Sequence, residues 1–145
     1  MSLIEWEKNG WVTSHKTSPR EITELLSVAA RDLADSQTKG LSTDSQLSIS
    51  YNAALQVATA ALAASGYRAA REKHHYRVIQ SLAHTIGAKA DFVAQLDSFR
   101  KKRNISDYER VGAVSAQEAK EMFTLAKTLR EAVTAWLKKN HPELL

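Results

Sequence analysis

The sequence predicts an all-α protein: one domain built as a five-helix up-and-down bundle. Three observations support this class. Apolar residues recur at helical spacing in five segments, serines suited to capping precede helices and glycines follow them, and the chain has only two prolines and five glycines. With 145 residues the chain can bury one core but not two. We expect residues 18–141 to form the bundle and residues 1–17 to form an arm whose Trp6 and Trp11 pack onto it.

The composition limits the kinds of site and location. There is no cysteine, so disulfides, thiol nucleophiles and thiolate metal sites are excluded. A net charge of +4 is a mild basic bias that permits RNA or DNA as a partner without requiring either. We see no apolar run near the ~18 residues that a membrane span needs, and the N-terminus carries Glu5 and Glu7 instead of a signal-type core. We therefore expect a cytoplasmic protein with no membrane partner.

The first two helices are marked by caps and glycines. "SPRE" places Ser18 at an N-cap with Glu21 completing a capping box, and this helix should end before Gly40. The second follows "STDS" at 42–45 and should stop at Gly66. Because it is rich in alanine, neighbouring helices can approach it closely, so it is the candidate central helix.

The remaining three helices follow the same logic. "HHYRVIQSLAHTIG" is amphipathic and ends at Gly87, "DFVAQLDSFR" gives a fourth helix, and "SAQE" at 115–118 is a second capping box before a long amphipathic helix that ends near Asn140. The short connections predict antiparallel neighbours. No segment reads convincingly as a strand, so none is expected.

The register of the fourth helix decides how its basic end "RKKRN" is oriented. One face carries the series Phe92, Leu96, Phe99 and then Arg103. Arg100 and Asn104 lie one step round from Arg103, whereas Lys101 and Lys102 should point outward to solvent. Two arginines and an asparagine thus continue the buried stripe to the mouth of the bundle.

A buried guanidinium is costly unless it has a partner. Arg103 should therefore pair with a carboxylate, cap helix carbonyls, or lie in a cleft that a phosphate can enter, since its planar fork suits phosphate oxygens. From periodicity alone, bonds to backbone carbonyls or to Asp97 or Asp107 are the favoured interpretation.

Three segments resemble the HEPN domains (higher eukaryotes and prokaryotes nucleotide-binding), over roughly residues 20–140. They are "SISYNAALQVATAALAASGYR", "HHYRVIQSL" and "LDSFRKKRNISDY". The family signature is an arginine, a polar residue, and a histidine four to six residues after the arginine. Arg103-Asn104 matches its first half, and Tyr108 stands where the histidine would be. The chain is thus similar to a variant with Arg-Asn-x3-Tyr in place of Arg-x4-6-His.

The resemblance implies an all-α domain, commonly a homodimer, that binds RNA or a nucleotide without a cofactor. The implied cleft residues are Arg100, Arg103, Asn104 and Tyr108, with Tyr51, Asn52 and Arg68 as further nucleic-acid contacts. Packing explains Tyr51 and Asn52 equally well, and Tyr51 needs a partner for its hydroxyl.

Two other functions remain open. The first is a metal-independent, toxin-like endoribonuclease in which Arg103 stabilises charge, Asn104 orients a phosphate, and Tyr108 or His75 assists proton transfer. Tyrosine is a poor base because its free pKa is ~10, which leaves catalysis in doubt. The second is a protein-interaction role, as the partner of a nucleotidyltransferase-type protein in a toxin–antitoxin pair.

The histidines and the remaining cations give weaker signals. His74 and His75 point about 100° apart on a helix and cannot easily share a metal, so no metal site is predicted. We expect His75 to pack against the core and His74 to be exposed. One further group of cations and aromatic residues could contact a nucleic-acid backbone and stack on its bases, and could equally be a solvated basic face. Its members are Tyr67, Arg68, Arg71, Lys73, Tyr76 and Arg77.

Overall fold

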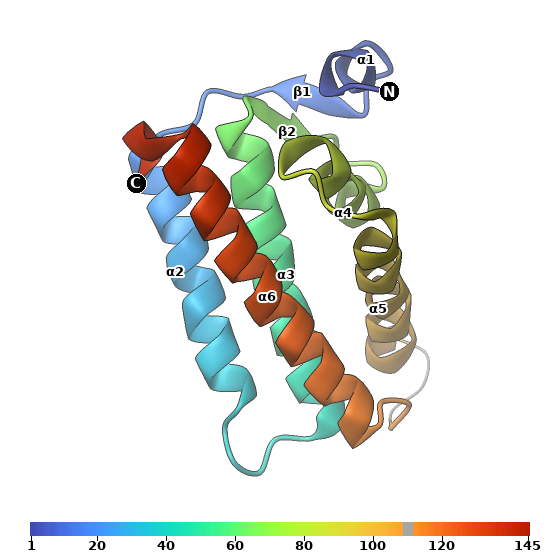
Figure 1. Cartoon of the computed structure of the whole chain (residues 1–145). Helices are drawn as coiled ribbons and strands as arrows, with labels where there is room; N and C mark the ends of the chain where they lie inside the picture. The colour runs from blue at the N-terminus through green and yellow to red at the C-terminus, as the bar shows by residue number, and fades with distance from the viewer. Residues whose placement is uncertain (109–111) are drawn as a thin grey trace.

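Helices make up most of this computed structural model, which describes residues 1–108 and 112–145, and the side chains of 1–105 and 112–145. The elements, in order, are α1 (Leu3–Lys8), β1 (Val12–Ser14), α2 (Pro19–Ser36), α3 (Thr43–Ala64), β2 (Tyr67–Ala69), α4 (His74–Thr85), α5 (Ala90–Tyr108), α6 (Ala116–Asn140) and a 3₁₀ turn (Pro142–Leu144) (Figure 1). The all-α class is confirmed. The predicted count of five helices missed α1, which lies in the arm.

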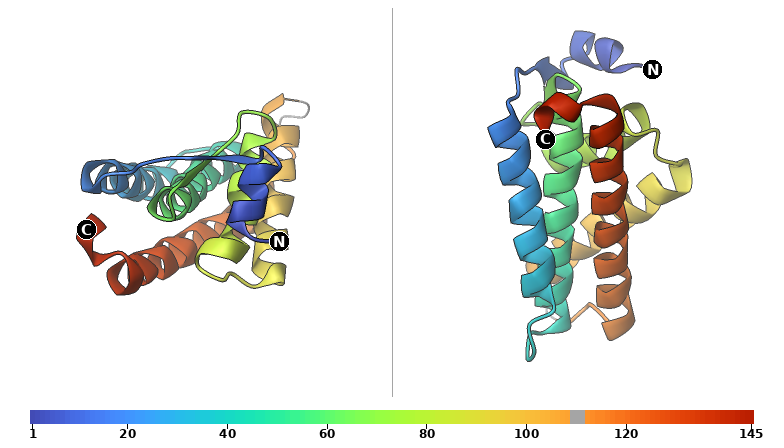
Figure 2. Two further views of the ribbon diagram at one scale, coloured as in Figure 1. Left: turned by 90° about the horizontal axis from the view of Figure 1, so that it is seen from above. Right: turned by 60° about the vertical axis from the view of Figure 1, so that its left-hand side comes forward.

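Helix α3 is the centre of the bundle. It packs against α2 on one side and α6 on the other, and its remaining surface contacts α4 and α5 (Figure 2). Five of its alanines are almost completely buried: Ala53, Ala54, Ala58, Ala60 and Ala61. Such small side chains let the neighbouring helices come close, as the alanine content predicted.

The same composition makes α3 long and apolar enough to cross a membrane, with a mean hydropathy of 1.2 over its best window. Polar residues interrupt α3, so the sequence still contains no continuous apolar run of this length. Within the bundle, 67% of that window is buried. Packing against other helices accounts for the apolar character of α3.

Serine caps begin three helices of the bundle: α2, α3 and α6. The side chains of Ser18, Ser42 and Ser115 each accept a hydrogen bond from the backbone N–H three residues on. The box at Ser115 is complete, because the Glu118 carboxylate accepts from the Ser115 N–H. At Ser18 only the cap is formed, since the Glu21 carboxylate turns instead toward Thr17 and His15.

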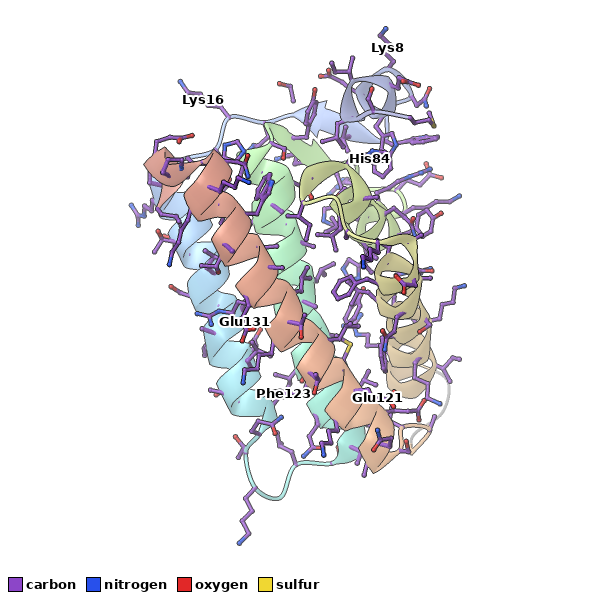
Figure 3. The ribbon with its side chains drawn as sticks, in the orientation of Figure 1. Lys8, Lys16, His84, Glu121, Phe123 and Glu131 are labelled. Carbon is purple, nitrogen blue, oxygen red and sulfur yellow. The ribbon has the colours of Figure 1, made fainter. Side chains whose placement is uncertain are left out.

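The arm packs onto the bundle, as predicted, and adds a strand to it. Strand β1 pairs antiparallel with β2, in the register Val12↔Ala69, so the expectation of no strand was wrong. Trp6 is buried, and its ring lies 5.1 Å from that of His84. Figure 3 shows His84 at the end of α4, near the arm. The guanidinium of Arg77 lies 3.8 Å from the ring centre of Trp11. Aromatic and cation–π contacts therefore hold the arm against α4.

Candidate functional site

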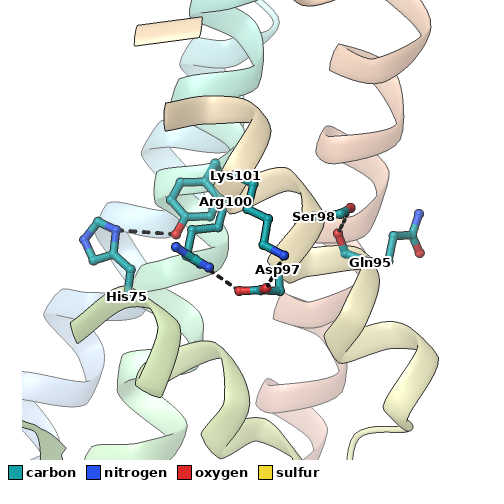
Figure 4. A network of polar contacts seen from close by, with 7 residues as sticks. His75, Gln95, Asp97, Ser98, Arg100 and Lys101 are labelled. Atoms are coloured by element: carbon teal, nitrogen blue, oxygen red, sulfur yellow. Dashed lines mark hydrogen bonds and ion pairs between the residues drawn. The ribbon is translucent and has the colours of Figure 1, made fainter. Parts of the chain in front are cut away.

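The candidate site lies where the C-terminal half of α5 passes α3 and the start of α4 (Figure 4). Helix α5 supplies Arg100 and Arg103, α3 supplies Tyr51, and α4 supplies His75 and Tyr76. These five side chains, called the arginine cluster below, come from three helices.

The register of α5 puts both arginines on the inner side. Phe99 is buried, and Arg100, Arg103 and Asn104 are half-buried, whereas Lys101 is exposed, as the periodicity predicted. Lys102 is the exception. It was expected in solvent, but its Nζ lies 3.3 Å from a carboxylate oxygen of Glu118, because the start of α6 lies beside it.

The buried carboxylate of Asp97 interacts with two cationic side chains of α5. The Nε of Arg100 donates to Oδ1 of Asp97 at 2.7 Å, and the Nζ of Lys101 lies 3.8 Å from Oδ2 (Figure 4). The sequence suggests Asp97 or Asp107 as a partner for Arg103; Arg100 makes the contact with Asp97, and the side chain of Asp107 lies outside the described residues. Because two cations share one carboxylate, this part of the cluster keeps a net positive charge.

Each arginine also lies close to an aromatic ring from another helix. The guanidinium carbon of Arg103 is 5.6 Å from the ring centre of Tyr51, and that of Arg100 is 5.5 Å from the ring centre of Tyr76. Both distances are within the range of cation–π attraction. The rings therefore help to fix the two guanidinium groups near the mouth of the bundle.

Tyr51 finds the hydroxyl partner that its burial requires. The side chain is 1% exposed, and its hydroxyl lies 3.4 Å from Nδ1 of His75, in a hydrogen bond whose direction depends on the imidazole tautomer. Burial raises the pKa of Tyr51 above its ordinary value, against the opposing effect of Arg100 and Arg103. The hydroxyl is thus protonated at neutral pH.

His75 is half-buried, as predicted, and its surroundings disfavour the imidazolium form. Burial lowers its pKa first, and the charges of Arg103, His74 and Arg100 lower it further. At neutral pH the ring is therefore uncharged and can accept a proton. The same burial and charges make it a weaker base than a free imidazole, and an anion bound beside the arginines would raise its pKa again.

A polar hollow of about 240 Å³ adjoins Arg103 between α2, α3 and α5, lined also by Ser48, Ile49 and Asn52. On its α2 side the buried carboxylate of Asp32 accepts a hydrogen bond from Asn52 Nδ2 at 2.7 Å. Arg31 contacts the other oxygen of Asp32 at 3.2 Å. Tyr51 and Asn52 thus both lie near Arg103.

Sequence reasoning missed Asp32. A signal was present, since this acidic residue falls between Ala29 and Leu33 on the buried stripe of its helix. A carboxylate at such a position needs a buried partner, and Asn52 provides it.

Four predicted site residues are not among the five cluster side chains. Asn52 lines the hollow beside Arg103, and the half-buried Asn104 follows Arg103 on α5. Arg68 lies in β2 and lines a separate cavity with His15 and Glu21. Tyr108 is the last residue of α5, and its side chain lies outside the described residues. Across the described residues, no group of three or more histidine and acidic side chains is arranged to hold a metal ion.

The chain matches no protein-family model, and no curated protein is significantly similar to it. Membership of the HEPN family stays a prediction that rests on the three segments quoted above.

Proposed function

We propose that the protein is a HEPN-like domain that binds RNA or a nucleotide through phosphate contacts at the arginine cluster. The observation that carries this proposal is the inward register of Arg100 and Arg103 beside Tyr51 and His75. In the proposed homodimer, Arg100, Arg103, Asn104 and Tyr108 of both subunits face one shared cleft, as the family resemblance suggests.

The chemistry of the cluster favours an anionic ligand. Guanidinium groups bind phosphate through two parallel hydrogen bonds, and two cations already share the carboxylate of Asp97. Partial burial strengthens such contacts because water screens them less. Tyr76 offers a ring on which a base can stack beside the phosphate.

Binding of a fluorescein-labelled, single-stranded RNA tests the proposal by anisotropy at low and physiological salt. Arg103→Ala should weaken binding about tenfold or more, as expected for loss of a charge-assisted contact, and should reduce the salt dependence. Arg20→Ala is the control, since this exposed arginine at the start of α2 forms only an ion pair with Glu24.

Equal affinity in all three proteins, with helicity unchanged by circular dichroism, would contradict the proposal. It would favour the alternative role as partner of a nucleotidyltransferase-type protein. Sedimentation equilibrium tests the dimer separately, and a monomer at the concentrations used for binding would overturn that part.

His75 supports a second candidate function, metal-independent RNA cleavage. In this reaction the ribose 2′-oxygen attacks the adjacent phosphorus and its proton passes to His75, while the P–O5′ bond breaks and the leaving 5′-oxygen takes a proton from water. The products are a 2′,3′-cyclic phosphate and a 5′-hydroxyl, and Arg103 would stabilise the charge on the transition state.

Cleavage of a defined RNA in EDTA tests this reaction. We expect His75→Ala and Arg103→Ala to abolish it and His84→Ala to leave it unchanged. His84 is a matched control because burial lowers its pKa too, but it packs against Trp6 away from the cluster. Cleavage that survives in His75→Ala would exclude this role for the imidazole.

A further inference from the structure

A second cavity, separate from the arginine cluster, lies under the β1–β2 ribbon at the other end of α3. It has a volume of about 300 Å³ and is bounded by α2, α3, β2, α4 and the residues after β1. Its α3 residues begin at Thr59, two turns beyond Tyr51, or about 12 Å along the helix. The cavity is therefore a site of its own.

The floor of this cavity is apolar. Leu62, Ala63 and Val78 are 1%, 3% and 1% exposed and form it together with Leu25. A compact hydrocarbon or aromatic group could displace water from this surface with a gain in free energy. At ~30 Å³ for each water-sized unit, the space holds about ten non-hydrogen atoms.

The rim is positively charged. Arg68, Arg71, His15 and His74 line it, and Glu21 is its only acidic residue among the described side chains. Arg68 and Arg71 form no ion pair with another residue that the structure describes. Two guanidinium groups are thus available to a ligand at the mouth of an apolar cavity.

Glu21 offsets this charge only in part, because its own hydrogen bonds are made to other residues. Its Oε1 accepts from the Thr17 hydroxyl at 2.6 Å and lies 2.8 Å from Nε2 of His15. The Thr17 hydrogen bond is the largest cause that lowers the pKa of Glu21. The carboxylate therefore orients His15, and although the charge of Arg68 also helps to lower the pKa of Glu21, neither arginine forms an ion pair with it among the described residues.

We propose that this cavity binds a small amphipathic anion: a compact apolar body in contact with Leu25, Leu62 and Val78, and a carboxylate or phosphate held by Arg68 and Arg71. Adjacent residues of α4 then serve two sites. His74 faces this cavity and His75 faces the arginine cluster. Arg68, which the sequence suggested as a nucleic-acid contact, belongs to the new site.

Titration with phenyl phosphate and phenylacetate, followed by isothermal calorimetry and by the methyl resonances of Leu25 and Val78, tests the proposal. At least one of the two anions should bind and shift both methyl signals, and the pair separates phosphate from carboxylate preference. Inorganic phosphate lacks the apolar body and benzyl alcohol lacks the charge, so each should bind at least about tenfold more weakly.

The double variant Arg68→Gln/Arg71→Gln should weaken anion binding at least about tenfold. Both side chains are exposed, so the fold should tolerate it. Lys16→Gln is the control, since it removes a nearby exposed charge that does not line the cavity.

Three results would overturn the proposal: no binding of either aryl anion, binding unchanged in the double variant, or benzyl alcohol binding equally well. The outcome is independent of the arginine cluster, because Arg103→Ala should not alter phenyl phosphate binding. Loss of RNA binding in the double variant with anion binding intact would return Arg68 to the nucleic-acid interface and reject the cavity as its site.

Discussion

The hydroxyl of Tyr51 lies 3.4 Å from Nδ1 of His75, and this contact joins the central helix α3 to the start of α4. It brings together a buried phenol that stays protonated and a half-buried imidazole that stays neutral. The positive charges of Arg100 and Arg103 act on both groups. The four side chains therefore behave as one electrostatic unit, and replacing one member should change the others.

Tyr51→Phe should destabilise the protein by about 0.5 to 1.5 kcal/mol, the usual contribution of one hydrogen bond. The phenyl ring keeps the packing, so the loss reports on the hydroxyl alone. Urea denaturation at pH 7 measures it. An unchanged midpoint would mean that the contact with His75 contributes no stability.

Arg103→Met should raise the pKa of His75 toward its ordinary value. Removal of the guanidinium charge relieves one of the causes that lower it, while burial by the surrounding helices remains. NMR titration of the imidazole Cε1 proton measures the change, with Arg20→Met as the control. A pKa that stays the same in Arg103→Met would show that this charge does not act on His75.

Stability should fall as the pH is lowered through the range in which histidine titrates in the unfolded chain, about pH 6.5 and below. The folded protein binds the His75 proton less readily than the unfolded chain does, so acid favours unfolding. His75→Gln should lose less stability than the wild type between about pH 7.5 and pH 5. Denaturant midpoints across this range check it, and identical slopes for the two proteins would contradict it.

Ser115→Ala should cost about 1 kcal/mol, because it removes the N-cap and one half of the capping box of α6. Ser98→Ala is the matched control. Ser98 is exposed within α5 and donates only to the Gln95 carbonyl (Figure 4). Thermal denaturation should show a lower midpoint for Ser115→Ala alone.

Ala58→Leu should destabilise the bundle by about 1 to 3 kcal/mol, since α3 has no room for a larger side chain at this fully buried position. Ala34→Leu in α2 is the control, because Ala34 is exposed and leucine is a good helix former. Equal stability of the two variants would mean that α3 is less tightly packed than its alanines indicate.

The sequence predicted the long helices and the inward face of α5 because these depend on local patterns. Ser42 and Ser115 mark the starts of their helices in the sequence. The spacing from Phe99 to Arg103 depends on one helix alone, so it predicts which face Arg103 is on. The ribbon could not be predicted in this way. Each strand has three residues, and Val12 pairs with Ala69 across two long helices.

The contacts within the candidate site were less predictable, since they depend on how separate helices dock. Nothing near Tyr51 in the sequence indicates that His75 will be its partner. The spacing within α5 predicted that Lys102 faces solvent. It could not show that Glu118, from the start of another helix, would lie beside it. The spacing of Glu21 from Ser18 predicted a capping box, but its carboxylate forms hydrogen bonds with Thr17 and His15 instead.

The pairing of β1 with β2 also sets an order of events during synthesis. The arm is translated before the bundle, yet its partner strand is made only after α2 and α3 are complete. The contacts of Trp6 and Trp11 form later still, because their partners His84 and Arg77 belong to α4. The arm is thus translated before the bundle but is among the last parts of the fold to acquire its native neighbours, and a nascent chain interrupted before α4 carries two tryptophans without these contacts.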